Sequence, residues 1–440
     1  MSTKSQKAIS LKTIKKQSDE IALDKGDRVL IISSMQAEAA IAAALLSRAI
    51  LQSGKLFHLT FIEPFVTVDE INELRKNFHE FAIIGVGLSI EGTKRFKKGR
   101  SYPVFVGSES TTEQFSTISI GAKNCISASV HMLANRITNS DSFGLGLAAA
   151  ATLVGHYSQF KMKGAAREIT TTAQKQGLVE ERKGFRLFGA NFLPLNETLT
   201  YSIRPFLKSF EGRIDFCDKL LEEAEIPFSR FRLPLTSLTN EEAQRLTAEL
   251  LPRLDSHVIP KVLGQDYLFV GEEENSPVRM ISGIRFMAES AWSLGMAGAS
   301  TSIWIGDRAQ TLRSFLDLYF SHSRAVITEF EQVKKTLMNK DIQFSGKFQI
   351  VPAGGIRKEL HADLARLSLE EGTVESDAVL FVNDKGITLS WREKKVNAAE
   401  VSIKLRQIGL KPRMLSETSS HVEIASTEIR DATLKMLENL

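Results

Sequence analysis

The chain has 440 residues, of which 43% are hydrophobic and 25% are charged. This is the ordinary balance of a globular protein, and the length is enough for two or three domains. The net charge of +4 does not by itself indicate nucleic-acid binding. Two cysteines, Cys125 and Cys217, are too few for a disulfide framework or a zinc cluster. The longest apolar stretch, residues 145–155, is too short to cross a bilayer, and no apolar signal core starts the chain, so we expect a cytoplasmic protein.

Residues 1–25 carry several lysines with weak periodicity. They could form a mobile arm or a short helix, and we interpret them as a basic N-terminal arm. From Arg28 onward, short apolar runs alternate with helical patterns. Strands are predicted over 29–33, 56–63, 81–87, 103–108 and 116–121, and helices over 37–51, 68–77, 127–138 and 145–160. This alternation predicts a parallel sheet with helices on its faces. Ligands of such sheets bind beyond the carboxyl ends of the strands.

After residue 212 the composition changes to amphipathic helices. We predict four successive parts: a parallel-sheet domain over 26–210, a mainly helical insert over 211–310, a long connecting helix over 311–340 and a smaller C-terminal α/β domain over 341–440. In the last part, strands are predicted over 348–353, 378–383 and 387–393, with a helix over 397–409. The glycine-rich stretch 351–355 is more typical of a turn than of a phosphate cradle.

Residues 164–207 contain the skeleton RLFG…PL…YS…PF. This segment closely resembles the one that follows the catalytic core in archaeal RecJ-like proteins of the DHH phosphoesterase superfamily, the branch associated with the replication factor GINS. The likeness continues through IWIGDR at 303–308 and covers nearly the whole chain from Arg28. It implies an α/β fold with a DHH-type domain over 26–210 and a DHH-associated domain over 341–440.

The resemblance also implies where the metal ligands of a phosphoesterase would lie. The Asp-x-Asp motif falls on SMQAEAA, the Asp-x-Gly-x-Gly motif on IIGVG, the Asp-His-His motif on GSE and the Gly-Asp motif on GH. The positions in this chain are Ser34, Gln36, Glu38, Ile83, Gly107, Ser108, Glu109 and His156.

Two-metal hydrolysis needs several carboxylates to hold paired Mg²⁺ or Mn²⁺ ions. Ile83 has no lone pair to offer, Gly107 has no side chain, and Gln36 lacks the negative charge. The resemblance therefore implies a degenerate site with no catalytic residue, no metal and no cofactor.

One alternative keeps a single ion. Glu38, Glu109 and His156 could together hold it as a carboxylate–histidine cluster. The other interpretation is that Glu109 is solvated and that His156 packs at a helix end.

A basic cluster lies in a predicted loop after the third strand, and it is joined by lysines of the N-terminal arm. These side chains could contact single-stranded DNA electrostatically, although many basic runs are simply solvated. The loop cluster comprises Lys94, Arg95, Lys97, Lys98 and Arg100, and the arm lysines are Lys4, Lys7, Lys12, Lys15 and Lys16.

Two further candidate DNA contacts lie in the C-terminal domain. The resemblance places a substrate-contacting arginine at Arg392, whose alternative is an ordinary ion-paired surface residue. It also places a glycine-rich loop at residues 419–426, where His421 is retained but serines stand for the glycines. Such glycines let backbone amides approach phosphate closely, so their loss predicts a weakened grip.

The resemblance implies a complex with GINS and, through it, with the MCM helicase ring. The eukaryotic Cdc–MCM–GINS helicase contains a RecJ-like subunit with a similarly degraded site, and this chain looks like an archaeal counterpart associated with the nucleoid. The helical insert, with Phe286 and Trp292, is a candidate docking surface, unless these two residues belong to the core. Alternatives are a divergent metal-dependent single-strand exonuclease or phosphodiesterase, and a free-standing single-strand binding protein.

Overall fold

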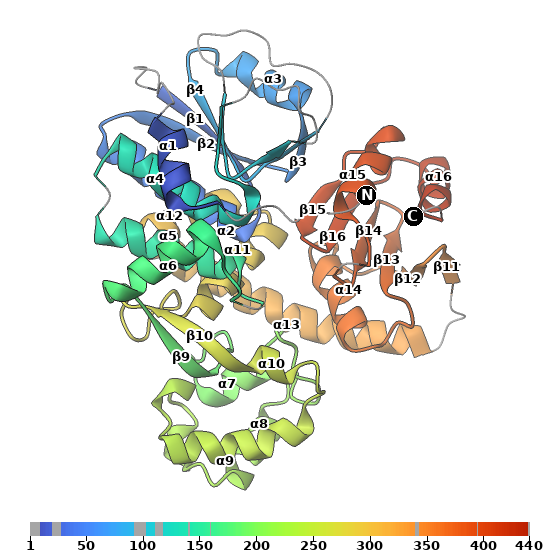
Figure 1. Ribbon diagram of the computed structural model, residues 1–440. Coiled ribbons are helices and arrows are strands. Elements are labelled where there is room, and N and C mark those ends of the chain that lie inside the picture. The colour runs from blue at the N-terminus through green and yellow to red at the C-terminus, as the bar shows by residue number, and fades with distance from the viewer. Residues whose placement is uncertain are drawn as a thin grey trace. The chain divides into compact units, whose positions relative to one another are not determined.

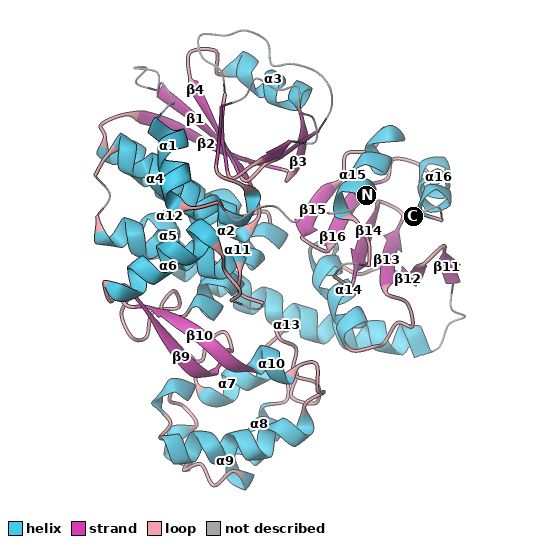
Figure 2. Ribbon diagram, viewed as in Figure 1, coloured by secondary structure: helices cyan, strands magenta, loops and turns pink. Residues whose placement is uncertain are grey.

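A computed structural model describes residues 9–19, 28–91, 103–110, 118–139, 141–158, 160–338, 343–393 and 395–438. The chain is mixed α/β and forms two compact units (Figures 1 and 2). The first unit contains Met1–Lys183, Gln265–Trp292 and Met296–Arg313, and the second contains Gly184–Gly264, Ser293–Gly295 and Ser314–Leu440.

A five-stranded sheet forms the centre of the first unit. All its strands run parallel, in the order β2-β1-β4-β6-β8. The strands are β1 (Arg28–Ser34), β2 (Leu56–Ile62), β4 (Ala82–Val86), β6 (Val104–Val106) and β8 (Ile118–Ile120). Every residue of β1 after Arg28 is buried, as expected for a parallel strand that is covered on both faces.

Helices cover one face of this sheet. Helices α2 (Ala37–Gln52), α4 (Ile126–Ile137) and α5 (Ser142–Gly155) pack on one another, α6 (Gly164–Lys175) packs on α4 and α5, and α12 (Ala297–Ile305) packs on α2. Helix α11 (Ile281–Ser293) precedes α12. Nearly all of α2 is buried, which explains why its sequence is apolar on every side.

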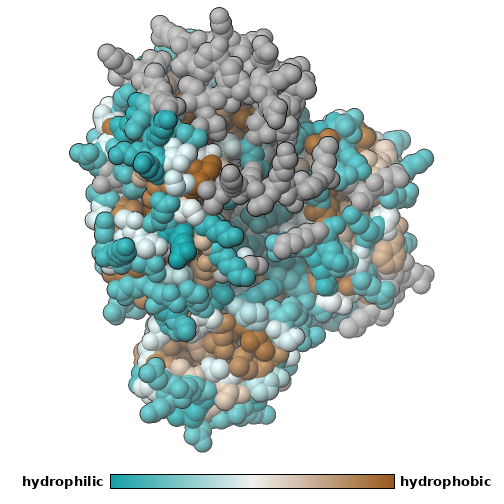
Figure 3. Space-filling view, in the orientation of Figure 1, coloured by the Kyte–Doolittle hydropathy of each residue, from teal (hydrophilic) through white to brown (hydrophobic). Residues whose placement is uncertain are grey.

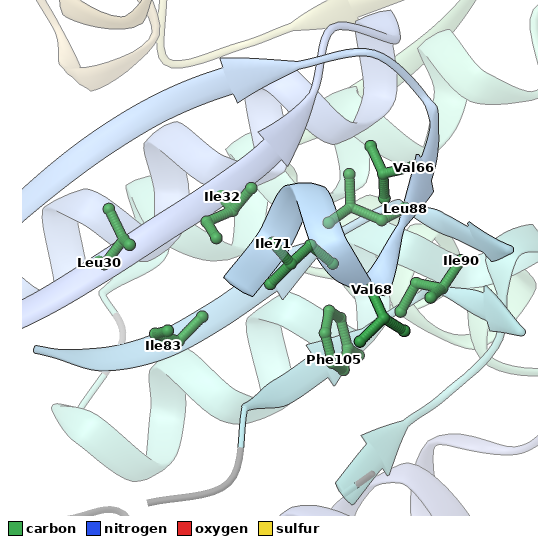
Figure 4. Packing of buried hydrophobic residues seen from close by; sticks show 9 residues of the cluster. All are labelled: Leu30, Ile32, Val66, Val68, Ile71, Ile83, Leu88, Ile90 and Phe105. Carbon is green, nitrogen blue, oxygen red and sulfur yellow. The ribbon is translucent and has the colours of Figure 1, made fainter. Parts of the chain in front are cut away.

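The opposite face is covered by α3 (Val68–Asn77) and by a small parallel sheet of β3 (Phe65–Thr67), β5 (Ser89–Glu91) and β7 (Glu109–Ser110). Alternate residues of the strands point to this side, because strand side chains alternate between faces. Figure 4 shows the resulting cluster of Leu30, Ile32, Val66, Val68, Ile71, Ile83, Leu88, Ile90 and Phe105.

The N-terminal segment contains a packed helix, α1 (Leu11–Asp19), which corrects its interpretation as an arm. Helix α1 contacts α4 and α6, and Ile14 is fully buried. The weak periodicity hid this helix because only Ile14 and Ser18 face inward. Nine residues are too few for a stable isolated helix, so packing holds it.

The second unit begins with a helical lobe of α7 (Leu195–Thr200), α8 (Ile214–Glu223), α9 (Asn240–Leu250) and α10 (Ile259–Val262). Strands β9 (Val179–Phe185) and β10 (Leu263–Phe269) pair with each other, and the chain passes from one unit to the other within each of them. The predicted long helix is α13 (Gln310–Met338).

The C-terminal part of the second unit contains a six-stranded mixed sheet in the order β11-β12-β13-β14-β16-β15. Only β12 and β13 pair in parallel, and α14 packs on β13 and β14. The elements are β11 (Gln343–Ser345), β12 (Phe348–Pro352), α14 (His361–Glu370), β13 (Ala378–Asn383), β14 (Gly386–Trp391), α15 (Ala398–Gln407), β15 (Arg413–Ser416), β16 (Ser419–Glu423) and α16 (Thr427–Leu437).

The segment that carries the family resemblance has a packing role in this unit. The Phe206 ring meets Phe330 of α13 edge to face, with centroids 5.4 Å apart. Arg204 donates to the buried carboxylate of Asp363 at 2.7 Å, and His322 bonds the other oxygen at 3.0 Å. Burial alone would raise the pKa of Asp363, but the charge of Arg204 and the bond from His322 outweigh it and hold that pKa well below its usual value.

The predicted fold class is confirmed: a parallel-sheet α/β part, many helices and a smaller mixed sheet. The structure adds the short strands β3, β5 and β7, which lie within predicted loops or strand ends. Among the helices that the structure describes, none combines the length and apolar character needed to span a membrane.

Candidate functional site

The strands of the parallel sheet end in one row. Ser33 of β1 lies beside Val86 of β4, Val86 beside Val106 of β6, and Val106 beside Ile120 of β8. The next residue of each strand therefore stands at the carboxyl edge, where ligands of such sheets bind. These four edge residues are Ser34, Gly87, Gly107 and Gly121.

Gly87 and Gly107 leave no room for a side chain at this edge. Both have left-handed backbone conformations, with φ of +64° and +58°. A Cβ on Gly87 would lie 2.7 Å from the Cβ of Ala39, and a Cβ on Gly107 would lie 2.6 Å from the Cα of Ile126. The first turns of α2 and α4 thus close directly on the glycines, and a carboxylate does not fit at either position.

The register corrects the placement of Ile83 at the candidate metal site. Ile83 pairs with Leu30, four residues before the end of β1, and it belongs to the hydrophobic cluster of Figure 4. At about 3.3 Å per residue, it lies roughly 13 Å back from the edge. The β4 residue at the edge is Gly87, the last glycine of the IIGVG match. The match did not identify it as the edge residue, although the end of the apolar run IIGV could have indicated this.

Glu38 keeps its carboxylate but uses it inside the protein. Its Oε1 accepts hydrogen bonds from the backbone N–H of Ser127, at 3.0 Å, and from the Ser127 hydroxyl. Its Oε2 lies against Gly155, where a Cβ would overlap it. Because Ser127 is in the first turn of α4, the negative charge stabilises that helix end. Burial raises the pKa of the Cys125 thiol, and the nearby charge of Glu38 raises it further.

The other candidate ligands are held by the backbone around them. Ser108 Oγ accepts from the N–H of Leu88 at 3.1 Å and contacts the carbonyl of Val106, so it links the ends of β4 and β6. Glu109 lies in β7 and donates its N–H to the carbonyl of Leu88. His156 ends α5, and its Nδ1 bonds the carbonyl of Thr152 at 3.0 Å.

The two positions at the end of β1 are weak ligands. Ser34 Oγ is buried and has no hydrogen-bond partner in the described part of the chain. Gln36 is the N-cap residue of α2, and its side chain makes no capping bond. Neither brings a negative charge.

The residues at the sheet edge do not fit the paired divalent ions that a DHH-type hydrolase would need. The edge offers a serine, an amide and three glycines, and the Glu38 carboxylate nearby already accepts two hydrogen bonds. Within the described ranges, no three histidine, cysteine, aspartate or glutamate side chains come together as a metal-binding group.

Of the candidate DNA contacts, Lys94, Arg95, Lys97, Lys98 and Arg100 lie outside the described residues, as do Lys4 and Lys7. Lys12, Lys15 and Lys16 are exposed on α1.

Arg392 is held by its own domain. Its guanidinium donates to the carbonyl of Leu369 at 2.8 Å and lies 3.6 Å from the carboxylate of Asp377. Asp377 also pairs with Lys395. The side chain remains half exposed, so its charge is compensated rather than removed from solvent.

His421 lies in strand β16 rather than in a loop, which corrects the sequence interpretation of residues 419–423. Its Nδ1 bonds Thr388 Oγ1 at 2.9 Å. Burial, and then the proximity of His361 and Lys358, lower the pKa of His421 to about 4. The imidazole is therefore neutral at pH 7 and offers no positive charge to a phosphate.

Phe286 and Trp292 are not a docking surface, because both are buried in α11. On the face seen in Figure 3, hydrophobic residues instead gather on the lobe of α7 to α10. Ile214, Phe216, Phe228 and Leu233 are the large apolar side chains exposed in that lobe.

The fold recurs in known structures, although no family model and no curated protein matches the chain. CDC45 from Entamoeba histolytica has a TM-score of 0.59 at 9% identity, over 96% of this chain and 97% of that one. RecJ from Thermus thermophilus, in complex with Mn²⁺, has a TM-score of 0.46 at 12% identity, over 98% of this chain and 55% of that one. The chain thus has the α/β fold of this CDC45 over almost its full length.

Proposed function

We propose that this protein is a non-catalytic scaffold of an archaeal replicative helicase, which binds GINS and, through it, MCM, and touches single-stranded DNA. It would act in the cytoplasm at the nucleoid. The observation that carries the proposal is the row of glycines at the carboxyl edge of the parallel sheet, where a hydrolase of this fold would need carboxylates.

Two further observations support a binding role. The Glu38 carboxylate stabilises α4, so its presence near a former ligand position is explained without a metal. Within the segment 164–207, which carries the resemblance to GINS-associated RecJ-like proteins, Arg204 bonds Asp363 of α14 and Phe206 packs on Phe330 of α13, so these two residues have a structural role. The similar fold of CDC45 agrees with a role in replication.

The test combines two assays on the purified full chain. In the first, tagged protein is incubated with GINS from the same organism, and the proposal predicts stable co-elution on gel filtration. In the second, single-stranded DNA is incubated with the protein and Mn²⁺, and the proposal predicts no digestion above the buffer control.

A divergent single-ion exonuclease would give the opposite pattern. Digestion that requires Mn²⁺ and disappears in both Glu38→Ala and His156→Ala would refute the scaffold proposal. DNA retention without any association with GINS would favour a free-standing single-strand binding protein instead.

A further inference from the structure

Basic side chains gather where the start of α1 meets the start of α6. The N–H of Ala165 donates to the carbonyl of Ile9 at 2.6 Å, and the N–H of Leu11 donates to the carboxylate of Glu168 at 3.3 Å. Helices α1 and α6 contact each other. Six exposed cations flank this contact, and we call them the α1–α6 basic surface: Lys12, Lys15, Lys16, Lys161, Lys163 and Arg167.

These six charges are uncompensated by the described residues. Within the part of the chain that the structure describes, none of them forms an ion pair or a side-chain hydrogen bond, whereas Arg204 and Arg308 pair with buried carboxylates. Segments 9–19 and 160–168 contain only two acidic residues, Asp19 and Glu168. Because Glu168 caps the start of α1, its charge is directed at that helix end. The α1–α6 basic surface therefore has a positive electrostatic potential that the small net charge of the whole chain does not indicate.

Helix α1 holds its three lysines in a fixed arrangement. Glu168 satisfies a backbone N–H at its first turn, and the guanidinium of Arg136 donates to the carbonyl of Ser18 at its last turn. A negative group at the start and a positive group at the end both stabilise the helix dipole. Ile14 and Ser18 face inward, so Lys12, Lys15 and Lys16 project outward.

The surface lacks the groups that read bases or enter a membrane. No large hydrophobic side chain is exposed in the described segments 9–19 and 160–168. The one aromatic residue there, Phe160, is half-buried and packs on Tyr157 and Tyr267. Base stacking needs an exposed aromatic ring, and membrane binding needs apolar residues beside the cations.

We infer that the α1–α6 basic surface binds the phosphate backbone of nucleic acid without base specificity, and that it binds a duplex at least as well as a single strand. A duplex carries the denser charge, and no stacking group favours unpaired bases. The inference deepens the proposed scaffold function and rests on it for the identity of the nucleic acid as DNA at the helicase.

Fluorescence anisotropy tests the inference with a labelled duplex and a labelled single strand of about 25 nucleotides, each titrated with full-length protein at several salt concentrations. Two variants divide the surface: K12A/K15A/K16A and K161A/K163A/R167A. Alanine preserves helix propensity. We expect each variant to weaken duplex binding roughly tenfold and to flatten the dependence of affinity on salt, since each lost phosphate contact removes about 0.9 from the slope.

The variant R232A/K335A/K411A is the matched control. It removes three cations that are exposed and unpaired elsewhere in the described part of the chain, and it should bind DNA like the wild type. The variant K12R/K15R/K16R keeps the charge and should also bind normally. Unchanged affinity in both alanine variants, an equal loss in the control, or a loss in the arginine variant would overturn the inference. So would binding to phosphatidylserine vesicles or poly-glutamate in place of DNA.

Co-elution with GINS is measured on the same proteins and separates the two proposals. Alanine variants that lose DNA but keep GINS support both. Wild-type protein that binds DNA through this surface but never retains GINS would refute the scaffold and leave the basic surface standing.

Discussion

Glu38 shows how a carboxylate near the carboxyl edge of the sheet can belong to the core. Both of its bonds to Ser127 end on one oxygen, and its other oxygen presses on Gly155. Together these contacts tie α2 to α4 and α5. A residue in this role stabilises the fold whether or not any ion binds.

Replacing Ser127 with alanine should therefore destabilise the protein. A hydrogen bond to a charged group contributes about 1.5–3 kcal/mol, and Ser127→Ala removes one without disturbing the helix. Urea unfolding should show a loss of that size. Ser47→Ala is the matched control, because the Ser47 hydroxyl is buried in α2 and bonds the neutral carbonyl of Ala43. A loss no larger than that of the control would contradict the role of Glu38.

The edge glycines give a second prediction. Gly107→Asp places a carboxylate at the edge, but it also puts a non-glycine residue in a left-handed conformation and makes its Cβ overlap with Ile126. It should therefore lower the free energy of unfolding by at least about 2 kcal/mol. Gly54→Asp is the control, since Gly54 has φ of +75° and no atom lies within 4 Å of the point that a Cβ would occupy. Equal urea midpoints for the two variants would show that the edge has room after all.

At the scale of elements, strand register explains what the sequence could predict and what it could not. The apolar runs predicted the parallel strands and the helices between them, because burial on both faces leaves a clear pattern. They could not place Ile83, since a motif match ignores how far each strand extends toward the edge. The apolar runs also did not predict α1 or β16. The local patterns of these two elements are weak, and tertiary contacts at Ile14 and Thr388 stabilise them.

The Arg204–Asp363 pair ties the resemblance segment to α14, and it yields a prediction on pH. Asp363→Asn should cost about 3–5 kcal/mol at pH 7, because it leaves Arg204 buried without its partner charge. The folded pKa of Asp363 is lowered, so its contribution is present above the unfolded pKa of about 3.9 and is lost as the pH falls below it. The difference in unfolding free energy from wild type should shrink on acidification.

Asp377→Asn is the control for that experiment. Asp377 is exposed and paired with Lys395 and Arg392, so its replacement should cost less than about 1 kcal/mol. If the two variants unfold alike at pH 7, the buried pair does not hold the element in place.

At the scale of the whole molecule, the chain contains both a parallel-sheet part and a mixed-sheet part, and small residues line the carboxyl edge of the parallel sheet. The fold shared with CDC45 runs almost from end to end, while the sheet edge carries glycines and the C-terminal histidine is neutral at pH 7. The described residues include two exposed features of note: the α1–α6 basic surface and the hydrophobic residues of the α7–α10 lobe. Under the proposed scaffold function, we expect these surfaces to contact DNA and partner proteins.

Anomalous diffraction from crystals soaked in Mn²⁺ tests the central claim most directly. Because the edge offers Ser34, Gln36, Gly87 and Gly107 in place of carboxylates, we predict no pair of manganese peaks beside them. Two strong peaks about 4 Å apart at the carboxyl ends of β1 and β4 would contradict the account.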